Sequence, residues 1–469
     1  MPVVVDESRR FDLHAPVLVV GAGACGLVAA LAARDAGAEV LVLERDAQPA
    51  GSTALSSGFI PACETRWQRE RGITDSFALM VADVQRKNHD EADPRVVEAV
   101  CRASGPTLEW LADMHGVPFV LVEGFLYPGH SALRMHAVPE KTGAALMAAL
   151  QRGAAGAGLD LLASAHVTTV YADRANRVRG VAFVRPDGSV EEVGCSALVL
   201  ACSGFGGNAA MVRHHIPEIA DALYFGHAGN QGDAVAWGTA LGAAVRDMTA
   251  YQGHGSVATP HGVLITWALM MEGGFQVNSH GRRFSNEHLG YSEQCVPVIA
   301  QPGRVAWNVY DERLHRLGME FEDYRGAHGL GAIRSAGTIA GLASACALPI
   351  EALAATFAEV SQYAAGTARD PSGRDFTGKP ALAPPYYAVK VTGALFHTQG
   401  GLVVDEQARV LDAAGASRPN LFAGGGAACG VSGARVWGYL SGNGLLAAVT
   451  LGRLAGISAA AMASRTKPA

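Results

Sequence analysis

The 469-residue chain lacks the patterns that mark several common functional classes. Its eight cysteines include no Cys-x-x-Cys pair and no histidine neighbour at metal-ligand spacing, so we expect no metal site, and reduced thiols of a cytoplasmic protein. No segment approaches about 18 consecutive apolar residues, and the N-terminus has no positive region followed by an apolar run, so we expect neither membrane insertion nor a signal peptide. A net charge of -6 without a basic stripe gives no reason to expect a nucleic-acid partner.

The chain does contain ample apolar material and much glycine. Apolar residues make up 49% and charged residues 17%, which is typical of a globular protein. The length exceeds one ordinary core and predicts two domains, or one large domain with an insertion. The 57 glycines exceed the usual share of about 7%, which indicates tight turns and close approaches of the backbone to a ligand.

Residues 17–44 have the pattern of a strand, a glycine turn, a helix and a second strand. The first strand ends in a GxGxxG motif. In this fingerprint Gly21 permits the tight turn, Gly23 lets the backbone approach a pyrophosphate, and Gly26 lets the helix pack close to the sheet. We expect the helix to end near Asp35 and the phosphates to lie at its N-terminus.

Glu44 follows the second predicted strand, 39–43. Its distance from the glycines suits a carboxylate that hydrogen-bonds the ribose hydroxyls of a dinucleotide. The segment therefore predicts a dinucleotide site, but by itself it does not distinguish FAD from NAD.

The run GSTALSSG, residues 51–58, makes the comparison more specific. Placed after this cradle, it resembles the flavoprotein family of fumarate reductase, succinate dehydrogenase and 3-ketosteroid dehydrogenases, whose members bind FAD. Residues 197–208 resemble the second FAD-contacting segment of that family. Residues 229–233 resemble its GDG turn, although Ala234 replaces the last glycine, and residues 421–426 resemble its closing segment.

The fingerprint and the resemblance together imply a set of FAD contacts. The predicted residues are Gly21, Gly23, Ala24, Gly26, Glu44, Arg45, Ser52, Thr53, Ser57, Gly58, Val167, Ser203, Gly204, Asp233, Gly424, Gly442, Asn443 and Leu445. In the family an acidic or amide residue often holds the ribityl chain after residue 424, but Gly425 and Gly426 occupy those positions here.

The resemblance also implies an α/β fold, with a Rossmann-like FAD-binding domain and an inserted α+β cap or substrate domain. We expect the FAD-binding domain at 1–240 and 381–469 and the cap at 241–380. The local patterns predict two or three scaffold helices within 66–115, a helix over 143–153, one strand over 159–171, a hairpin over 177–193, a strand at 197–200, a helix from about Asn443, and a loose tail over 458–469.

Two tyrosines stand where the dicarboxylate reductases of the family have substrate arginines. GRRFSNE, residues 281–287, matches the family's GxRFxNE, and the proton-donating arginine four residues later aligns with Tyr291. The arginine that clamps the dicarboxylate aligns with Tyr439. A permanently charged guanidinium suits a carboxylate, whereas a neutral phenol suits a ketone oxygen or an enolate. Ketosteroid dehydrogenases resemble the chain at both positions.

Three further side chains are candidate substrate contacts. The family's two substrate histidines correspond to His254 and His397, although either could instead be a structural histidine at a turn. Tyr127 is a third candidate. We expect a cyclic ketone as substrate, with hydride transfer to FAD, Tyr439 as base assisted by Ser441, and Tyr291 at the carbonyl oxygen; the two tyrosine roles could be exchanged.

Two alternatives remain open in the sequence. One is an ene-reductase of an unsaturated acid, with a carboxylate site supplied by Arg134, Arg283 and Arg435. The other is an electron-relay subunit, although residues 51–58 lack the histidine that would bond FAD covalently. The sequence indicates neither the electron acceptor nor the oligomeric state.

Overall fold

The apolar run before the glycine motif forms strand β2 (His14–Val20), in the middle of a nine-stranded sheet. In the computed structural model, which describes residues 2–465, β2 pairs in parallel with β3 (Val40–Leu43) and β10 (Val190–Leu200). Residues 17–20 are buried because helices and strands cover both faces of the sheet. The remaining strands of this sheet are β1 (Val3–Val5), β7 (Asp160–Leu162), β8 (His166–Ala172), β9 (Val178–Val184), β20 (Arg409–Leu411) and β21 (Ser417–Ala423).

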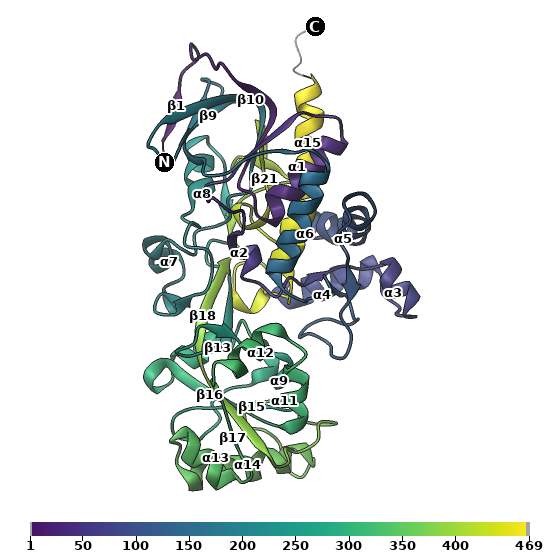
Figure 1. Ribbon diagram of the computed structural model, residues 1–469, viewed down its shortest axis with the longest axis vertical. Helices are drawn as coiled ribbons and strands as arrows, with labels where there is room; N and C mark the ends of the chain where they lie inside the picture. Colours follow the sequence, from purple (N-terminus) through teal and green to yellow (C-terminus); the bar gives the residue numbers. More distant parts are fainter. Residues whose placement is uncertain (1, 466–469) are drawn as a thin grey trace.

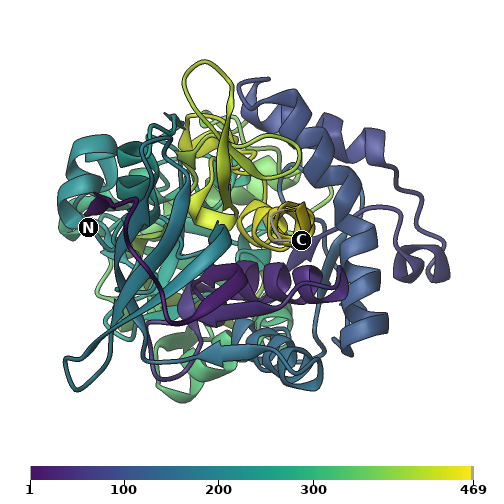
Figure 2. The same ribbon diagram turned by 90° about the horizontal axis from the view of Figure 1, so that it is seen from above.

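Helix α1 (Ala24–Asp35) follows the glycine turn and packs against the last helix, α15 (Asn443–Arg465). Figure 2 shows α15 end-on, beside the purple N-terminal segment. A Cβ on Gly452 would lie 2.6 Å from the Cys25 oxygen, and one on Gly456 would lie 2.1 Å from the Ala29 oxygen. Only glycine permits this close approach of the two helices.

Helix α15 bears on two predictions, the loose C-terminal tail and the absence of a membrane-spanning segment. The predicted loose tail from Ser458 is wrong up to Arg465, because α15 continues to that residue and buries Ala459 and Ala463. Residues 466–469 lie outside the described part. Within residues 2–465, α15 is the one helix whose length and composition would suffice to cross a membrane, and 56% of its apolar window is buried inside the protein, as in a core helix.

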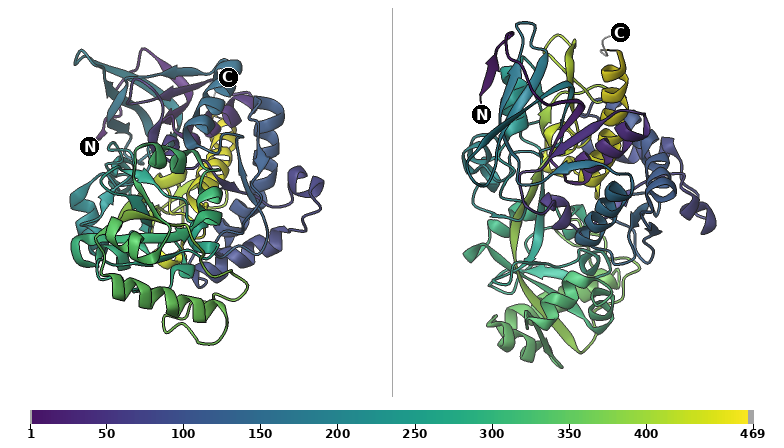
Figure 3. Two further views of the ribbon diagram at one scale, coloured as in Figure 1. Left: turned by 60° about the horizontal axis from the view of Figure 1, so that its bottom comes forward. Right: turned by 45° about the horizontal axis from the view of Figure 1, so that its top comes forward.

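The helices predicted within 66–115 are confirmed as three: α3 (Arg66–Glu70), α4 (Phe77–Asn88) and α5 (Pro94–His115). The predicted helix at 143–153 is α6 (Gly143–Gly156). These helices lie on one side of the first sheet (Figure 3, right). A small sheet of β4 (Ile60–Pro61), β6 (Met135–Ala137) and β5 (Val120–Leu121) connects them to the rest of the molecule.

The single strand predicted over 159–171 is wrong, because the chain forms β7 and β8 there. Strand β7 pairs with β3, whereas β8 pairs with β9 on the other side of the sheet. Ser164, between them, adopts a left-handed φ of 53°, which turns the chain out of the first strand. The predicted hairpin is confirmed as β9 and β10, and β10 continues through the segment that we expected to form a separate strand at 197–200.

A second, seven-stranded sheet contains most strands of the predicted cap region. Its strands are β11 (Leu223–Tyr224), β13 (Tyr251–Ala258), β14 (Val263–Leu264), β15 (Phe275–Val277), β16 (Val305–Asp311), β17 (Ile333–Ala336) and β18 (Tyr386–Thr398). Strand β18 pairs with four of the others and extends from this sheet towards the first sheet (Figure 1). Because β11 and β18 lie outside 241–380, this sheet does not coincide with the predicted cap boundaries.

The other elements border the two sheets. Helices α9 (Ala268–Met271), α10 (Cys295–Ile299), α11 (Glu312–Gly318), α12 (Glu322–Gly329), α13 (Ile339–Cys346) and α14 (Ile350–Ala364) belong to the cap region, seen from below in Figure 3 (left). Nearer the first sheet are α2 (Gly51–Ala54), α7 (Ala209–His215), α8 (Asp233–Ala240), β12 (Val245–Arg246) and β19 (Gly401–Leu402).

Candidate active site

The glycine turn after β2 forms one end of a long cleft, which we call the cradle. Gly21 has a φ of 101°, and a Cβ on Gly26 would lie 1.8 Å from the Gly21 oxygen, so both residues have the backbone roles that the motif predicts. Gly23 is the N-cap of α1, and it has no side chain to occupy the amides there. The Ala24 amide donates to Thr53 Oγ1 at 3.2 Å, and the next amides of this 12-residue helix remain available to an anion such as a pyrophosphate.

Glu44 is fixed beside the glycines. One carboxylate oxygen accepts the Ala22 amide at 2.7 Å, and the other accepts the Asp46 amide at 2.9 Å. Each oxygen retains a further lone pair, and the residue lines the cradle. A ribose hydroxyl can therefore donate to Glu44, so the donors and acceptors present fit the adenosine half of FAD.

Most of the predicted cofactor residues line the cleft. Those in the cradle are Gly21, Gly23, Ala24, Glu44, Arg45, Ser52, Thr53, Val167, Ser203 and Asp233, and those further along the cleft are Ser57, Gly58, Gly442 and Leu445.

Four predicted residues lie behind the cleft wall instead. Gly26 packs on the turn, a Cβ on Gly204 would lie 2.1 Å from Thr398 Oγ1, and a Cβ on Gly424 would lie 2.8 Å from Cys25 Sγ. The side-chain amide of Asn443 donates to Ser432 at 3.3 Å. These glycines permit close packing of the elements behind the site.

Several residues of the cradle were not predicted. His227 Nε2 lies 2.7 Å from the Asp46 carboxylate, and its Nδ1 accepts the Gly229 amide at 3.1 Å. Asn230 donates to Ser52 at 2.8 Å. These contacts join the two sides of the cradle. Because His227 lies two residues before the recognised turn at 229–233, extending that match towards the N-terminus could have found it.

The cradle opens into a second cavity, which we call the chamber. The cradle encloses about 840 Å³ and the chamber about 1160 Å³, counting their open mouths. Residues common to both are Ser52, Thr53, Ser203, Gly426 and Ala448. The shared wall makes one continuous cleft, long enough to place a bound dinucleotide against a separate substrate.

Aromatic side chains form much of the chamber wall. They come from eight well-separated positions of the chain and are Phe59, Tyr127, Phe225, Trp267, Tyr291, Phe321, Phe396 and Tyr439, with His254 and His397 among them. The five phenylalanine and tryptophan residues were not predicted, because no local pattern connects residues so distant in the sequence. Such a wall suits a flat, largely apolar ligand.

The predicted catalytic residues come together in the chamber. Tyr291 and Tyr439 have ring centroids 6.1 Å apart, and both are almost fully buried. His254 stacks on Tyr291 at 4.7 Å, and His397 lies edge-on to Tyr439 at 5.7 Å. Ser441 also lines the chamber, while its carbonyl accepts a hydrogen bond from His130 at 2.9 Å.

The surroundings of the two tyrosines differ. Burial raises the pKa of Tyr291 to about 12, and hydrogen bonds donated by Ser441, Tyr439 and the Gly442 amide oppose that rise. Burial and the neighbouring Tyr291 raise the pKa of Tyr439 well above its usual value. The Gly444 amide, in the first turn of α15, donates to the Tyr439 oxygen at 3.5 Å. The Gly442 amide lowers the pKa of both tyrosines, so Ser441 and Tyr439 are the donors particular to Tyr291, while Tyr439 lies at a helix N-terminus.

Both chamber histidines are neutral at physiological pH. Burial lowers the pKa of His254 to about 3 and that of His397 to about 4. Within residues 2–465, no arginine, lysine, aspartate or glutamate lines the chamber. A carboxylate bound there would have no cationic partner.

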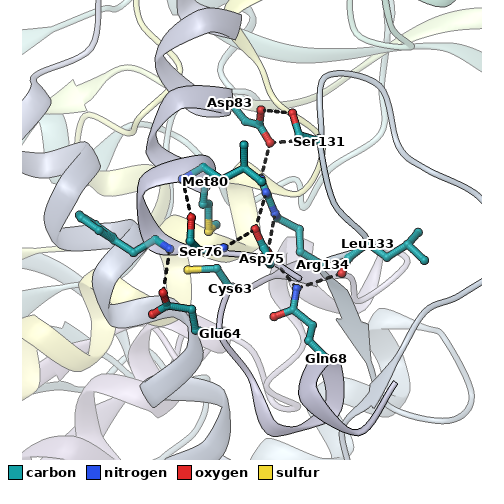
Figure 4. Close-up of polar contacts among 12 residues, drawn as sticks. Cys63, Glu64, Gln68, Asp75, Ser76, Met80, Asp83, Ser131, Leu133 and Arg134 are labelled. Carbon is teal, nitrogen blue, oxygen red and sulfur yellow. Dashed lines mark hydrogen bonds and ion pairs between the residues drawn. The ribbon is translucent and has the colours of Figure 1, made fainter. Parts of the chain in front are cut away.

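The three arginines proposed for a carboxylate site lie elsewhere. Arg134 is buried between Asp75 and Asp83, at 2.8 and 2.6 Å, in the network of Figure 4. Arg283 pairs with Glu287 at 2.7 Å and with Asp370 at 3.0 Å. Arg435 is exposed and does not line the chamber. The arginine site of the alternative hypothesis is therefore wrong.

Comparisons with known proteins agree with this geometry. Residues 16–445 match the family model described as FAD binding domain. The chain is 27% identical over 444 residues to a probable fumarate reductase of Shewanella frigidimarina, covering 95% of this chain and 74% of that protein. It is 26% identical over 553 residues to 4-oxocyclohexanecarboxylate 2-dehydrogenase of Sinomonas cyclohexanicum, covering 96% and 93%.

A solved structure is similar over the whole chain. The 3-ketosteroid-Δ4-(5α)-dehydrogenase of Rhodococcus jostii, in complex with 4-androstene-3,17-dione, superposes with a TM-score of 0.76. The two chains are 27% identical, and the match covers 98% of this chain and 99% of that one.

Proposed function

The chain belongs to the FAD-binding family whose model spans residues 16–445, and from that premise we propose that it desaturates a neutral cyclic ketone. It is an FAD-dependent oxidoreductase. The proposed reaction introduces a C=C bond between the carbons α and β to the carbonyl of a 3-ketosteroid or a smaller alicyclic ketone.

One observation carries this proposal: a pair of buried tyrosines in a chamber without charged side chains, next to the cradle. Phenols can bind a ketone oxygen and transfer a proton, whereas a buried carboxylate without a partner would lose several kcal/mol of solvation. The relatives include a fumarate reductase and a dehydrogenase named for a keto acid, but the arginine positions of the former are tyrosines here. Among the described residues no charged side chain lines the chamber, and this favours a neutral ketone over fumarate or a keto acid.

The chain's own groups divide the work between them. We assign the α proton to Tyr291, whose anion is favoured by hydrogen bonds from Ser441 and the Gly442 amide; in the ketone complex the single proton of the Tyr439 hydroxyl turns from Tyr291 to the ketone oxygen. Tyr439 holds the carbonyl oxygen, because it lies at the N-terminus of α15, where developing negative charge is stabilised. This assignment exchanges the two roles that the sequence suggested.

The electrons and atoms balance in this arrangement. Tyr291 reacts as its phenolate: the α C–H bond breaks, its proton binds the phenolate oxygen to give the neutral phenol, and its electron pair forms the C=C bond as hydride leaves the β carbon. Bound FAD supplies the hydride acceptor. The aromatic wall positions the ketone and excludes water from the reacting carbons.

Anaerobic mixing tests the proposal. The oxidised, FAD-loaded protein is mixed with neutral 3-ketosteroids and cyclohexanones, and in parallel the reduced protein is mixed with fumarate and other unsaturated acids. We expect the ketones to bleach the flavin absorbance. Bleaching by no ketone, together with rapid reoxidation by an unsaturated acid, would support the ene-reductase alternative instead.

A further inference from the structure

A chain of buried amides and hydroxyls ends at the Nδ1 atom of His397. Gln399 Nε2 lies 2.9 Å from that nitrogen. The Ser432 hydroxyl donates to Gln399 Oε1 at 2.8 Å and in turn accepts the Asn443 amide at 3.3 Å. Gln399 and Ser432 are 6% and 1% exposed, so water does not compete for these bonds.

The direction of these hydrogen bonds determines which ring nitrogen of His397 carries the proton. Because Ser432 donates to the Gln399 oxygen, the NH₂ group of Gln399 faces the imidazole, and Nδ1 must accept. The proton of the neutral ring is then on Nε2. Within residues 2–465, the competing contact of Nδ1 is with the Thr398 carbonyl, and it is longer at 3.4 Å.

The Nε2 edge of His397 faces the start of α15. A Cβ on Gly444 would lie 2.6 Å from Nε2, and the Gly444 amide contacts the Tyr439 oxygen. Gly444 thus lies beside both the Nε2–H of His397 and the hydroxyl of Tyr439, two groups that can donate to a bound ligand. The titratable groups nearest to His397 in the chamber are Tyr439 and, beyond it, Tyr291 and His254.

We propose that Gln399 is a positioning residue: it holds His397 as the neutral Nε2–H tautomer, and this N–H joins Tyr439 in holding the ketone oxygen. The inference rests on the proposed function. With the opposite tautomer, a lone pair on Nε2 would face the oxygen as it gains negative charge, and the site would lose one of its two donors. His254 is held in the same tautomer by the Ser256 amide, at 3.1 Å.

The tautomer can be observed without turnover. The FAD-loaded protein, labelled with ¹⁵N in histidine, is studied by long-range ¹H–¹⁵N correlation, with a His397→Asn variant to assign the ring. We expect a proton on Nε2 and none on Nδ1. A proton on Nδ1 would overturn the inference even if the protein oxidises ketones. Nε2–H in a protein that oxidises no ketone would contradict the proposed function and leave the tautomer assignment standing.

Two substitutions of Gln399 separate positioning from packing. Gln399→Met removes the donor and keeps the volume, so we expect flavin reduction by a ketone to slow by about 5- to 10-fold, the effect of one hydrogen bond, at every pH. Gln399→Glu places a carboxylate beside Nδ1. The neutral ring then carries its proton on Nδ1 and the rate falls further, but protonation of the ring at lower pH restores Nε2–H.

The pH dependence of the rate of flavin reduction distinguishes a positioning role of Gln399 from a packing role. We expect the rate of Gln399→Glu, relative to Gln399→Met, to rise as the pH falls through the raised pKa of His397. Gln407→Met, at an exposed glutamine, is the matched control and should leave the rate unchanged. Flavin absorbance and thermal unfolding show that each variant is loaded and folded. An equal loss in both Gln399 variants at all pH values would mean a packing role and would overturn the proposal.

Discussion

The cradle and the chamber share a wall but are built from different parts of the chain. The cradle consists largely of backbone groups around Gly21 and Gly23, with charged side chains such as Glu44 and Asp233 on its surface. The chamber consists of aromatic and hydroxyl side chains, and no charged side chain of the described residues lines it. One region is suited to an extended polar cofactor and the other to a neutral, flat substrate. Mutations at the cradle should therefore release FAD, whereas mutations in the chamber should slow the reaction while FAD remains bound.

The largest expected effect is directly behind the cradle, at Gly26. A Cβ there would collide with the Gly21 oxygen, so Gly26→Ala should lower the free energy of unfolding by about 3 kcal/mol or more and release FAD. Thermal unfolding and the flavin content of the purified protein measure this. Gly156→Ala, at a helical glycine with no atom within 4 Å of the added Cβ, is the control and should retain FAD. Equal behaviour of the two variants would contradict the backbone account of the cradle.

The next effect is in the chamber, at Tyr291. Tyr291→Phe should slow flavin reduction by a ketone at least about 10²-fold, because the proton acceptor is lost, while FAD remains bound. Anaerobic stopped-flow absorbance measures the rate. Tyr171→Phe removes a hydroxyl that bonds Glu192, away from the chamber, and should change nothing. A loss of FAD from Tyr291→Phe would contradict the assignment of cofactor binding to the cradle and of substrate chemistry to the chamber.

The third effect is the dependence on pH, which amounts to about tenfold per pH unit. Because the pKa of Tyr291 is raised to about 12, its anionic fraction grows tenfold per pH unit below that value. The rate of flavin reduction in the substrate complex should therefore rise about tenfold per unit between about pH 7 and 10. A flat profile in the native protein would remove Tyr291 as the base, and Tyr291→Phe should abolish the slope.

The smallest effect is expected from salt. A neutral ketone in an uncharged chamber has no ion pair to screen, so its dissociation constant should change less than about 2-fold between about 0.05 and 0.5 M salt. Titration of the flavin spectrum with a nonreactive enone measures this constant. A steep weakening with salt would indicate a charged contact in the chamber.

The difference between the regions also explains what could be predicted from the sequence. The glycine turn of the cradle follows from glycine spacing within one strand–turn–helix unit, so its fold and the lining residues Gly21, Gly23, Ala24 and Glu44 were accessible, whereas Ser203 and Asp233 were found through the family resemblance. The tyrosines were found through their alignment with family positions, but the roles of Tyr291 and Tyr439 depend on which hydroxyl receives more donors. That information, like the aromatic wall and the chain from Asn443 to His397, arises only when distant segments meet. Gly204 and Gly424 show the reverse case: they belong to the cofactor motifs, but a Cβ at either position would meet the packing behind the cleft, so their contact with FAD stays a prediction.

One matched pair of substrates tests the central claim most directly. 4-Oxocyclohexanecarboxylate and its methyl ester have the same ring ketone and differ in charge. Their rates of flavin reduction, divided by their dissociation constants, are compared in the native protein under anaerobic conditions. The uncharged chamber predicts that the ester is preferred by at least about 10²-fold, because the carboxylate would be buried without a partner. A preference for the carboxylate would contradict the account.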